Sequence, residues 1–256
     1  MSAVRGARER ARIEITAAIK EEARKQLAAE GAAKLSLRAV ARELGMASSA
    51  LYRYFPSRDE LLTALIIDAY DSVGESAEAA HRAARADAAP HLARWTAVAH
   101  AVRDWALAHP HEYALIYGSP VPGYHAPQAT IGPASRVGLV LIAVVGEAFR
   151  TDGLAVPPLA DELRTEAERM VAEFAPGLPP GVVAPLIAAW SQLFGLISFE
   201  IFGQFQRVVE AREIFFREAV TELARTVGLL GPPQLTTSGA TADDLARGRS
   251  RQPARR

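Results

Sequence analysis

The sequence contains no cysteine, which excludes disulfide bonds and thiolate metal sites. Its first fifteen residues carry charged side chains where a secretory signal would carry an apolar run. No stretch alternates between polar and apolar residues for long enough to predict a strand. Nucleophile-elbow, phosphate-loop and dinucleotide-binding motifs are also missing. We therefore expect an all-α cytoplasmic protein, and no enzyme class has a motif in its favour.

The net charge is zero, but the charges are unevenly distributed along the chain. Residues 1–58 hold twelve Lys and Arg against six Asp and Glu, a net charge of +6. Residues 59–231 have a net charge of −9, and residues 232–256 have a net charge of +3. A basic first segment on an acidic body is typical of a protein whose first part meets a polyanion such as DNA.

The most apolar stretch spans residues 182–205 and is about long enough to cross a membrane. Polar side chains interrupt it throughout, among them Gln192, Ser198 and Glu200. A helix buried in a core or in a subunit interface fits this pattern better than a membrane span. We therefore expect no membrane contact.

The first forty-five residues predict two helices and the turns that end them. Apolar residues recur every four positions in the first helix, which Gly31 can end: Ile15, Ile19, Ala23 and Leu27. Ser36 can then cap a second helix, and Leu35 and Val40 occupy the positions of a hydrophobic staple. Gly45 can supply a left-handed turn at the end of that helix.

The segment "GMASSALYRYFPSRDEL", residues 45–61, predicts a third short helix with two different faces. A helix of about two turns from near Ser48 to Phe55 directs Leu51 and Phe55 inward and turns serine, tyrosine and arginine side chains toward solvent. Pro56 stops this helix, and Ser57 with the glutamate at position 60 forms a capping box for a fourth. Two short helices joined by a tight turn make a helix-turn-helix, whose outward face has the composition of a surface that enters a DNA groove.

The segment "LSLRAVARELGMASSALYRYFPSRDELL" resembles the DNA-binding region of the TetR family of transcriptional regulators. The resemblance covers roughly residues 10–66 and implies an N-terminal three-helix domain followed by a larger helical dimerisation and effector domain. It implies binding to a near-palindromic DNA operator, most often as a repressor. Together with the outward face, it gives these candidate DNA contacts: Ser36, Arg38, Ala47, Ser48, Ser49, Tyr52, Arg53, Tyr54 and Arg58. The family often has lysine at the position of Ser48, so more of the affinity here is expected to come from Arg53, Arg58 and the N-terminal arm.

Each DNA contact has a second interpretation. Tyr54 can pack between helices, and Arg53 and Arg58 can be ordinary solvated charges. The arginines at positions 5, 8, 10 and 12 can act as a flexible arm on DNA or can simply keep the terminus in solution. A helix-turn-helix can also serve protein contact alone, in a helical small-molecule-binding protein or an enzyme.

Beyond residue 75 the pattern predicts long helices with proline-rich joints. We expect helices at 90–108, 133–151, 158–173, 181–206 and 208–228. His109 and Pro110 are expected to close the first of these, and a turn-rich loop is expected at 118–127. The chain is thus divided into a DNA-binding domain (1–58), a ligand-binding and dimerisation domain (59–231) and a disordered tail (232–256).

The second domain resembles the TetR branch named for Trp, His and Gly in its C-terminal region, although Phe194 stands at the histidine position. Helices near the C-terminus commonly form a two-fold interface in this family. The apolar surface of 193–203 supports a homodimer through Leu193, Leu196, Phe199, Glu200 and Gly203. A small hydrophobic effector is the expected ligand, and the candidate pocket residues are Trp95, Trp105, His109, Tyr113, Tyr117, Tyr124, Phe149, Trp190 and Phe194.

Each of these aromatic residues can instead be core. The pair His109 and His111 could suggest metal ligands, but the proline between them and the lack of a third nearby ligand favour a solvated helix end. We expect no cofactor and no metal.

Overall fold

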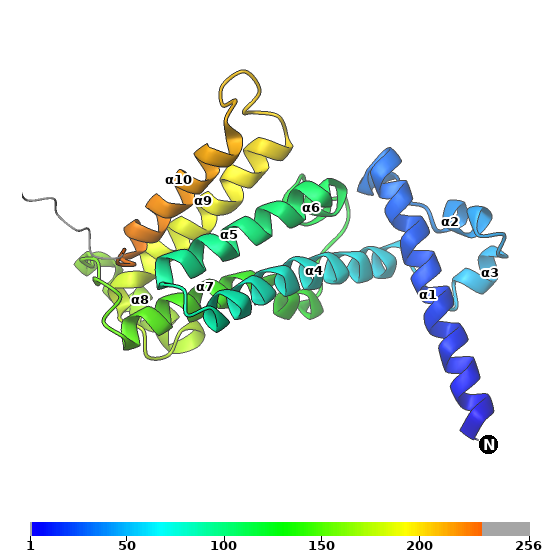
Figure 1. The fold of residues 1–256 in the computed structure, drawn as a ribbon. Helices are drawn as coiled ribbons and strands as arrows, with labels where there is room; N and C mark the ends of the chain where they lie inside the picture. The colour runs from blue at the N-terminus through cyan, green and yellow to red at the C-terminus, as the bar shows by residue number, and fades with distance from the viewer. Residues whose placement is uncertain (1, 232–256) are drawn as a thin grey trace, which may run out of the picture.

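The computed structural model describes residues 2–231, and their side chains from residue 6 onward. The tail expected at 232–256 lies outside the described residues. Figure 1 shows helices joined by loops. One isolated bridge between Leu154 and Leu229 is the only extended pairing among the described residues. The all-α prediction is therefore confirmed. The α-helices are α1 (Ser2–Glu30), α2 (Leu37–Glu43), α3 (Ser48–Leu51), α4 (Arg58–Ala86), α5 (His91–Ala108), α6 (Pro110–Tyr117), α7 (Ile131–Arg150), α8 (Arg164–Phe174), α9 (Val183–Ile201) and α10 (Arg212–Val227). Short 3-10 turns lie at Ala32–Lys34, Gln128–Thr130, Asp161–Leu163 and Pro180–Val182.

The N-terminal unit has its own apolar core. It contains the residues that the four-residue repeat of α1 and the inward faces of α2 and α3 predict, namely Ile19, Ala23, Leu27, Leu35, Leu37, Val40, Ala41, Leu51 and Phe55. Leu61, Leu62 and Leu65 of α4 also belong to this core. The N-terminal unit therefore extends past the boundary expected at residue 58, because α4 begins there and its first turns supply core side chains.

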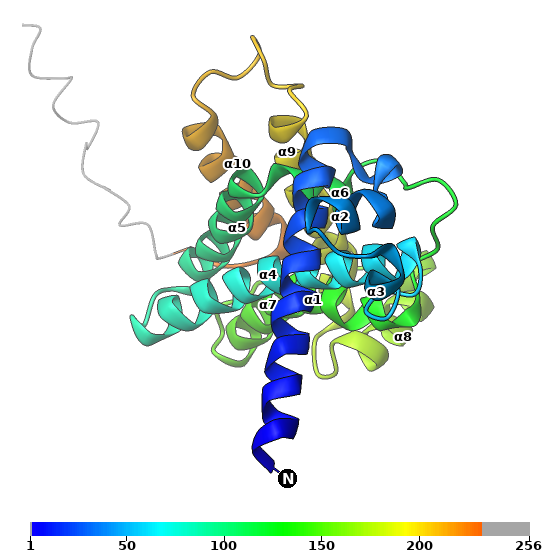
Figure 2. The same ribbon diagram turned by 90° about the vertical axis from the view of Figure 1, so that its right-hand side faces the viewer.

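The ends of the predicted N-terminal helices differ from expectation at two places. α1 is helical from Ser2, so the predicted flexible arm is part of a 29-residue helix that projects beyond the rest of the unit (Figure 2). α3 ends at Leu51, and Tyr52–Tyr54 continue as turns up to Pro56. The Tyr52 amide donates a hydrogen bond to the Ser48 carbonyl at 3.1 Å, so the helical hydrogen-bond pattern continues beyond Leu51.

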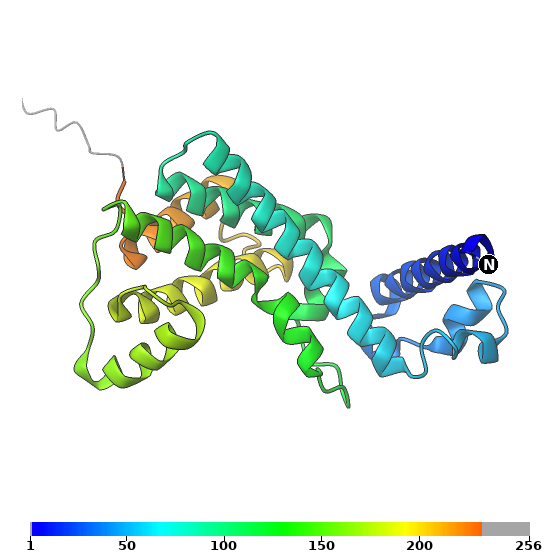
Figure 3. The ribbon, with the colours of Figure 1, turned by 90° about the horizontal axis from the view of Figure 1, so that it is seen from below.

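The larger C-terminal unit is a bundle in which α4, α5 and α7 pack together and α9 and α10 pack against α5 (Figure 3). One contiguous core joins these helices, with Trp95, Val144 and Ile197 among its buried members. α4 spans 29 residues and contributes to both cores, so the two units share one continuous helix.

The sequence did not predict α6. Pro110 was expected to close the preceding helix, but it stands at the first turn of a new one, with Glu112 in that turn. Proline is favoured at a first helical position because its missing N–H has no partner there in any case. α6 lies between the N-terminal unit and α9, with contacts to α1 on one side and to α9 on the other.

Two described helices, Gln128–Arg150 and Pro180–Ile201, are long and apolar enough to cross a membrane by length and composition alone. Both also supply core side chains, such as Val144 and Ile197. This arrangement is typical of core helices in a bundle, as the sequence analysis expected for residues 182–205.

Candidate functional site

The helix-turn-helix is formed by α2, the turn at Gly45, and α3. The hydroxyl oxygen of Ser36 accepts a hydrogen bond from the Ala39 amide at 3.4 Å and caps α2, as predicted. Gly45 has a φ of +63°, a left-handed conformation that glycine adopts at little cost. The Met46 amide donates to the Ala41 carbonyl at 2.8 Å, which closes the turn and directs the chain into α3.

The residues of α3 divide into the two faces that the sequence predicts. Leu51 is fully buried and Phe55 is nearly so, and both lie in the N-terminal core. The opposite face is exposed and consists of Ala47, Ser48, Ser49, Tyr52 and Arg53, with Tyr52 42% exposed. Figure 2 looks toward this side of the molecule and shows that no other helix covers α3. A polar and cationic surface carried by buried anchors can therefore approach a duplex.

Two further candidate contacts lie at the edge of this face. Arg38 is exposed on α2, and Ser36, half-buried at the start of α2, has a free hydroxyl lone pair beyond its capping bond.

Tyr54 is half-buried, and the guanidinium of Arg12 lies 5.8 Å from the centre of its ring. Tyr54 and Arg12 thus bind α1 to the turn after α3, in agreement with the packing interpretation of Tyr54.

Arg58 has a different place from the one expected. Its Nη2 donates to the Ala32 carbonyl at 2.8 Å and to the Ala33 carbonyl at 3.2 Å, and its Nε donates to the Leu35 carbonyl at 3.2 Å. The guanidinium therefore joins the start of α4 to the turn before α2. Nη1 lies 3.6 Å from the Asp59 carboxylate. Arg58 is therefore held by the protein itself and is not an ordinary solvated charge, and its contact with a DNA phosphate stays a prediction.

The predicted effector residues do not form one pocket. Trp95 is buried, and its indole N–H donates to the Val220 carbonyl at 3.1 Å. The indole N–H of Trp105 donates to the Ser72 hydroxyl at 2.8 Å, and the Trp105 ring stacks on His109. The two tryptophans are buried and join α5 to α10 and α4, so the core interpretation applies to them, whereas His109 is exposed between α5 and α6.

A second group of the aromatic candidates does come together. Tyr117 stacks on Phe194 with ring centres 4.2 Å apart, and Tyr113 lies next to Tyr117. Tyr113 is buried and bonds to the Phe194 carbonyl and the Ser198 hydroxyl, and burial raises the pKa of Tyr113 to about 12. Trp190 touches the edge of Phe194 but is 40% exposed. The contacts Tyr113–Ser198 and Tyr117–Phe194 hold α6 on α9.

The last two candidates lie elsewhere. Tyr124 belongs to the loop after α6 and shares a 2.9 Å hydrogen bond with Thr63 of α4, beside the N-terminal core. Phe149 is exposed near the end of α7. Within the described part of the chain, neither ring is paired with the rings of Tyr113, Tyr117 or Phe194. Among the described residues no group of three His, Asp or Glu side chains is arranged to hold a metal ion.

α9 and α10 carry an exposed apolar surface. It includes Phe199 at 53% exposure together with Phe202, Ile214 and Phe215. A groove of about 540 Å³ runs between the two helices and is lined by Leu196, Phe199, Phe205 and Phe215, among others. Two of the residues expected at the interface point inward instead: Leu193 is in the core, and the Glu200 carboxylate binds Arg103.

Gly203, also expected at the interface, has a φ of +83° at the end of α9, where the chain turns toward α10. This conformation suits the turn and explains the glycine there without helix-to-helix contact.

Comparisons with known proteins agree with this geometry. The family described as bacterial regulatory proteins of the tetR family matches residues 19–65, and the tetracyclin repressor-like C-terminal domain matches residues 95–223. The second match alone covers half of the chain. The chain belongs to the TetR family. It is a DNA-binding transcriptional regulator.

Several known proteins are similar to this chain over most of its length. The HTH-type transcriptional regulators Rv1816 of Mycobacterium tuberculosis and Mb1846 of Mycobacterium bovis are each 43% identical over 209 residues, which is 78% of this chain and 86% of each relative. The solved structure of SCO4313, described as a regulatory protein, is 35% identical over 84% of this chain and 97% of its own, with a TM-score of 0.70. A tetR-family regulatory protein from Rhodococcus RHA1, 15% identical with a TM-score of 0.58 over 84% of this chain and 98% of its own, shares the fold.

Sequence reasoning missed two ion-pair networks that hold this TetR-family fold together. Arg103 of α5 forms two bonds to Glu200 of α9, Nε to Oε2 at 2.7 Å and Nη2 to Oε1 at 2.8 Å, and it also pairs with Glu213 of α10. The side chains of Arg103 and Glu200 are each only 7% exposed. These contacts raise the pKa of Arg103, chiefly through the hydrogen bonds to Glu200. An arginine and glutamates so far apart in sequence give no local signal of pairing.

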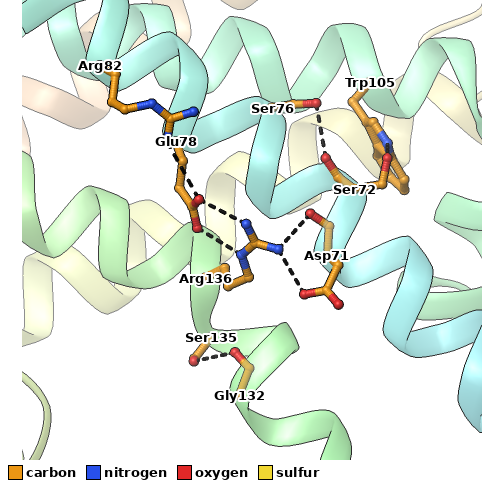
Figure 4. A network of polar contacts seen from close by, with 9 residues as sticks. All are labelled: Asp71, Ser72, Ser76, Glu78, Arg82, Trp105, Gly132, Ser135 and Arg136. Carbon is orange, nitrogen blue, oxygen red and sulfur yellow. Dashed lines mark hydrogen bonds and ion pairs between the residues drawn. The ribbon is translucent and has the colours of Figure 1, made fainter. Parts of the chain in front are cut away.

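The second network joins α4 to α7 (Figure 4). Arg136 donates to both carboxylate oxygens of Glu78, at 2.8 and 2.9 Å, and to the carboxylate and the carbonyl of Asp71. Gly74 lies beneath this arginine: a Cβ there would come within 2.7 Å of the Arg136 Cβ. The missing side chain therefore allows α7 to approach α4 closely.

Proposed function

We propose that this regulator is a homodimer that binds a near-palindromic operator through α3 and leaves it when a small hydrophobic effector binds. The observation that carries the proposal is the exposed face of Ala47, Ser48, Ser49, Tyr52 and Arg53, which is fixed by buried residues of the same short helix. Repression is the usual mode of the family, and we propose it here.

The proposed DNA contacts follow from side-chain size and charge. Ala47 and the two serines are small enough to let the start of α3 enter the major groove closely. The Tyr52 hydroxyl and the Arg53 guanidinium can reach phosphates, and Arg53 can also form two hydrogen bonds to a guanine edge. Arg38 and the Ser36 hydroxyl lie on the neighbouring α2, where they can bind the backbone.

The exposed surface of α9 and α10 supports the dimer. Exposed apolar side chains gathered into one surface are typical of a subunit interface. We propose that Phe199 and Phe215 pack against the same helices of a second copy. A two-fold dimer would place two α3 helices on successive major grooves, about 34 Å apart.

The effector would act by population shift. In one form of the dimer the two α3 helices are wrongly spaced for the operator. An effector that binds this form better than the DNA-binding form lowers operator affinity by the difference between its two binding free energies. We propose residues 1–58 with the first turns of α4 as the DNA-binding domain, and the remaining helices as the effector and dimerisation domain. We propose no catalytic activity for either.

Selection of bound duplexes from random DNA at low ionic strength would test the proposal. We expect a near-palindromic sequence to emerge, and we expect Arg53→Ala to relax preference at one base position by about 1–3 kcal/mol. Arg169→Ala is the matched control, because Arg169 is an exposed arginine of α8 on the other unit. No enriched duplex, or the same loss in both variants, would contradict the proposed role of α3.

A further inference from the structure

A groove of about 760 Å³ lies at the junction of the two units. One wall is the end of α1 with the following turn, including Leu27, Ala32 and Ala33, and the other is α6 with the segment 118–122, including Leu115, Tyr117 and Val121. We infer that this junction groove binds a small, uncharged, largely apolar molecule, and that this molecule is the effector. The inference rests on the proposed effector control and gives it a place.

The lining sets the chemical class of the ligand. Its described residues include no Asp, Glu, Lys or Arg. The small side chains of its alanines, together with Gly118, leave space between the two walls. The volume falls within the range of small-molecule sites, about 300–1,000 Å³. Tyr117 lines the groove, and its hydroxyl makes no hydrogen bond within the described part of the chain, so it can bind one polar atom of a ligand.

A neighbouring groove, also lined by residues of α1 and α6, has the opposite character. It is lined by Glu21, Arg24, Asp68 and Glu112, among others. Arg24 pairs with Asp68 at 2.7 Å and with Glu112 at 3.4 Å, so ion pairs bridge this groove. An uncharged apolar molecule would have to displace charged partners there, which leaves the junction groove as the better site.

The interior of the larger unit is a less favourable place for the same ligand. Trp95 and Tyr113 are buried, and their polar atoms already bind Val220, Phe194 and Ser198. A ligand among these side chains would break those hydrogen bonds and leave buried donors without partners, which is unfavourable. The junction groove can be filled without that loss.

The position of the groove connects a ligand to the DNA-binding surface. Ala32 and Ala33 form one wall, and their carbonyl groups accept hydrogen bonds from Arg58 at the start of α4. The same turn leads directly into Ser36, the cap of α2. On the opposite wall, Val121 packs against the N-terminal core. A ligand that separates these walls would therefore change how α2 and α3 are held on α4.

Fluorescence titration with 1-N-phenylnaphthylamine, an uncharged apolar probe, tests the site on the full-length protein. Ala33→Trp and Ala114→Trp fill the groove from opposite walls, and Ala172→Trp adds the same side chain on the exposed face of α8 as the control. We expect both groove variants to bind the probe at least about tenfold more weakly than the wild type does. We expect the control to bind it as the wild type does. In parallel, anisotropy of a labelled selected operator should show that the probe lowers DNA affinity in the wild type and in the control, but not in the two groove variants.

The outcomes separate this inference from the proposed function. Probe binding unchanged in both groove variants, with DNA release retained, would overturn the junction site and leave effector control standing. No probe binding by the wild type would overturn the assigned ligand class. Probe binding that is lost in the groove variants but never affects operator affinity would overturn the effector role of the groove. Because the two variants alter different walls, loss of folding in one leaves the other to decide.

Discussion

The guanidinium of Arg58 donates to the carbonyl oxygen of Ala32 at 2.8 Å, across 26 residues of chain. Its two further bonds, to Ala33 and Leu35, make it a clamp between the start of α4 and the turn before α2. A single carbonyl can be solvated by water. Three carbonyls that accept hydrogen bonds from one guanidinium fix the angle between α2 and α4. Arg58, which precedes Leu61 and Leu62, therefore has a structural role in holding the helix-turn-helix.

Arg58→Ala separates this role from phosphate contact. We expect operator affinity to fall while the dependence of log affinity on log salt keeps its wild-type slope, because no phosphate contact is removed. The thermal stability of the protein should fall as well. Anisotropy titrations at several salt concentrations measure the slope. A slope reduced by about one, with unchanged stability, would return Arg58 to the DNA contacts.

The features that the sequence predicted here are those with a local pattern. Ser36, Gly45, Leu51 and Phe55 occupy the positions that capping, turn and helical spacing require, and the structure places them accordingly. Short-range rules suffice because each of these residues acts within a few positions of its partner. The outward face of α3 follows from the same spacing.

The features that the sequence missed depend on distant partners or on competing local signals. The sequence pattern predicts a helix end at Pro110, although proline also begins helices, and Glu112 in the first turn is the available sign. The inward positions of Leu193 and Glu200 depend on which face of α9 meets α5, and spacing alone does not decide between two apolar faces. The candidate aromatic residues could be named but not grouped, because their grouping depends on how α6 packs on α9.

Phe199→Glu is expected to prevent dimerisation. Phe199 is 53% exposed on the apolar surface of α9 and α10, where a carboxylate would be buried against a second copy without a partner. Light scattering at micromolar concentration should report a dimer for the wild type and a monomer for the variant, with weaker operator binding. Phe149→Glu changes an exposed phenylalanine on α7 in the same way and should remain a dimer. A monomeric wild type would contradict the proposed assembly.

Arg103→Met is expected to destabilise the fold by about 3–5 kcal/mol, because it leaves the Glu200 carboxylate buried without its partner. The double variant Arg103→Met with Glu200→Met should recover most of that loss, since two apolar side chains can pack where the ion pair was. Glu213→Gln should matter much less, because the Glu213 side chain is 60% exposed. Urea unfolding of the four proteins measures the free energies. Equal losses in Arg103→Met and in the double variant would show that the unpaired Glu200 carboxylate is not the cause of the loss.

His81 of α4 should make the stability of the protein depend on pH in the weakly acidic range. It is buried, and this burial lowers its pKa from the ordinary value of 6.5, as do the nearby charges of Arg85 on α4 and Arg94 on α5. Glu147 of α7, 3.6 Å from its Nε2, acts in the opposite direction but does not reverse the shift.

Because the folded protein holds this proton more weakly than the unfolded chain, acid favours unfolding. The contribution of His81 is complete above the unfolded pKa and is lost as the pH falls from about 6.5 toward the lower folded pKa. Urea unfolding at about pH 7.5 and pH 5.5 should show a larger loss of stability for the wild type than for His81→Gln. His91 of α5 also has a lowered pKa, so the variant should keep part of the pH dependence. If the two proteins lost the same free energy between these pH values, the proton on His81 would have no part in the acid sensitivity.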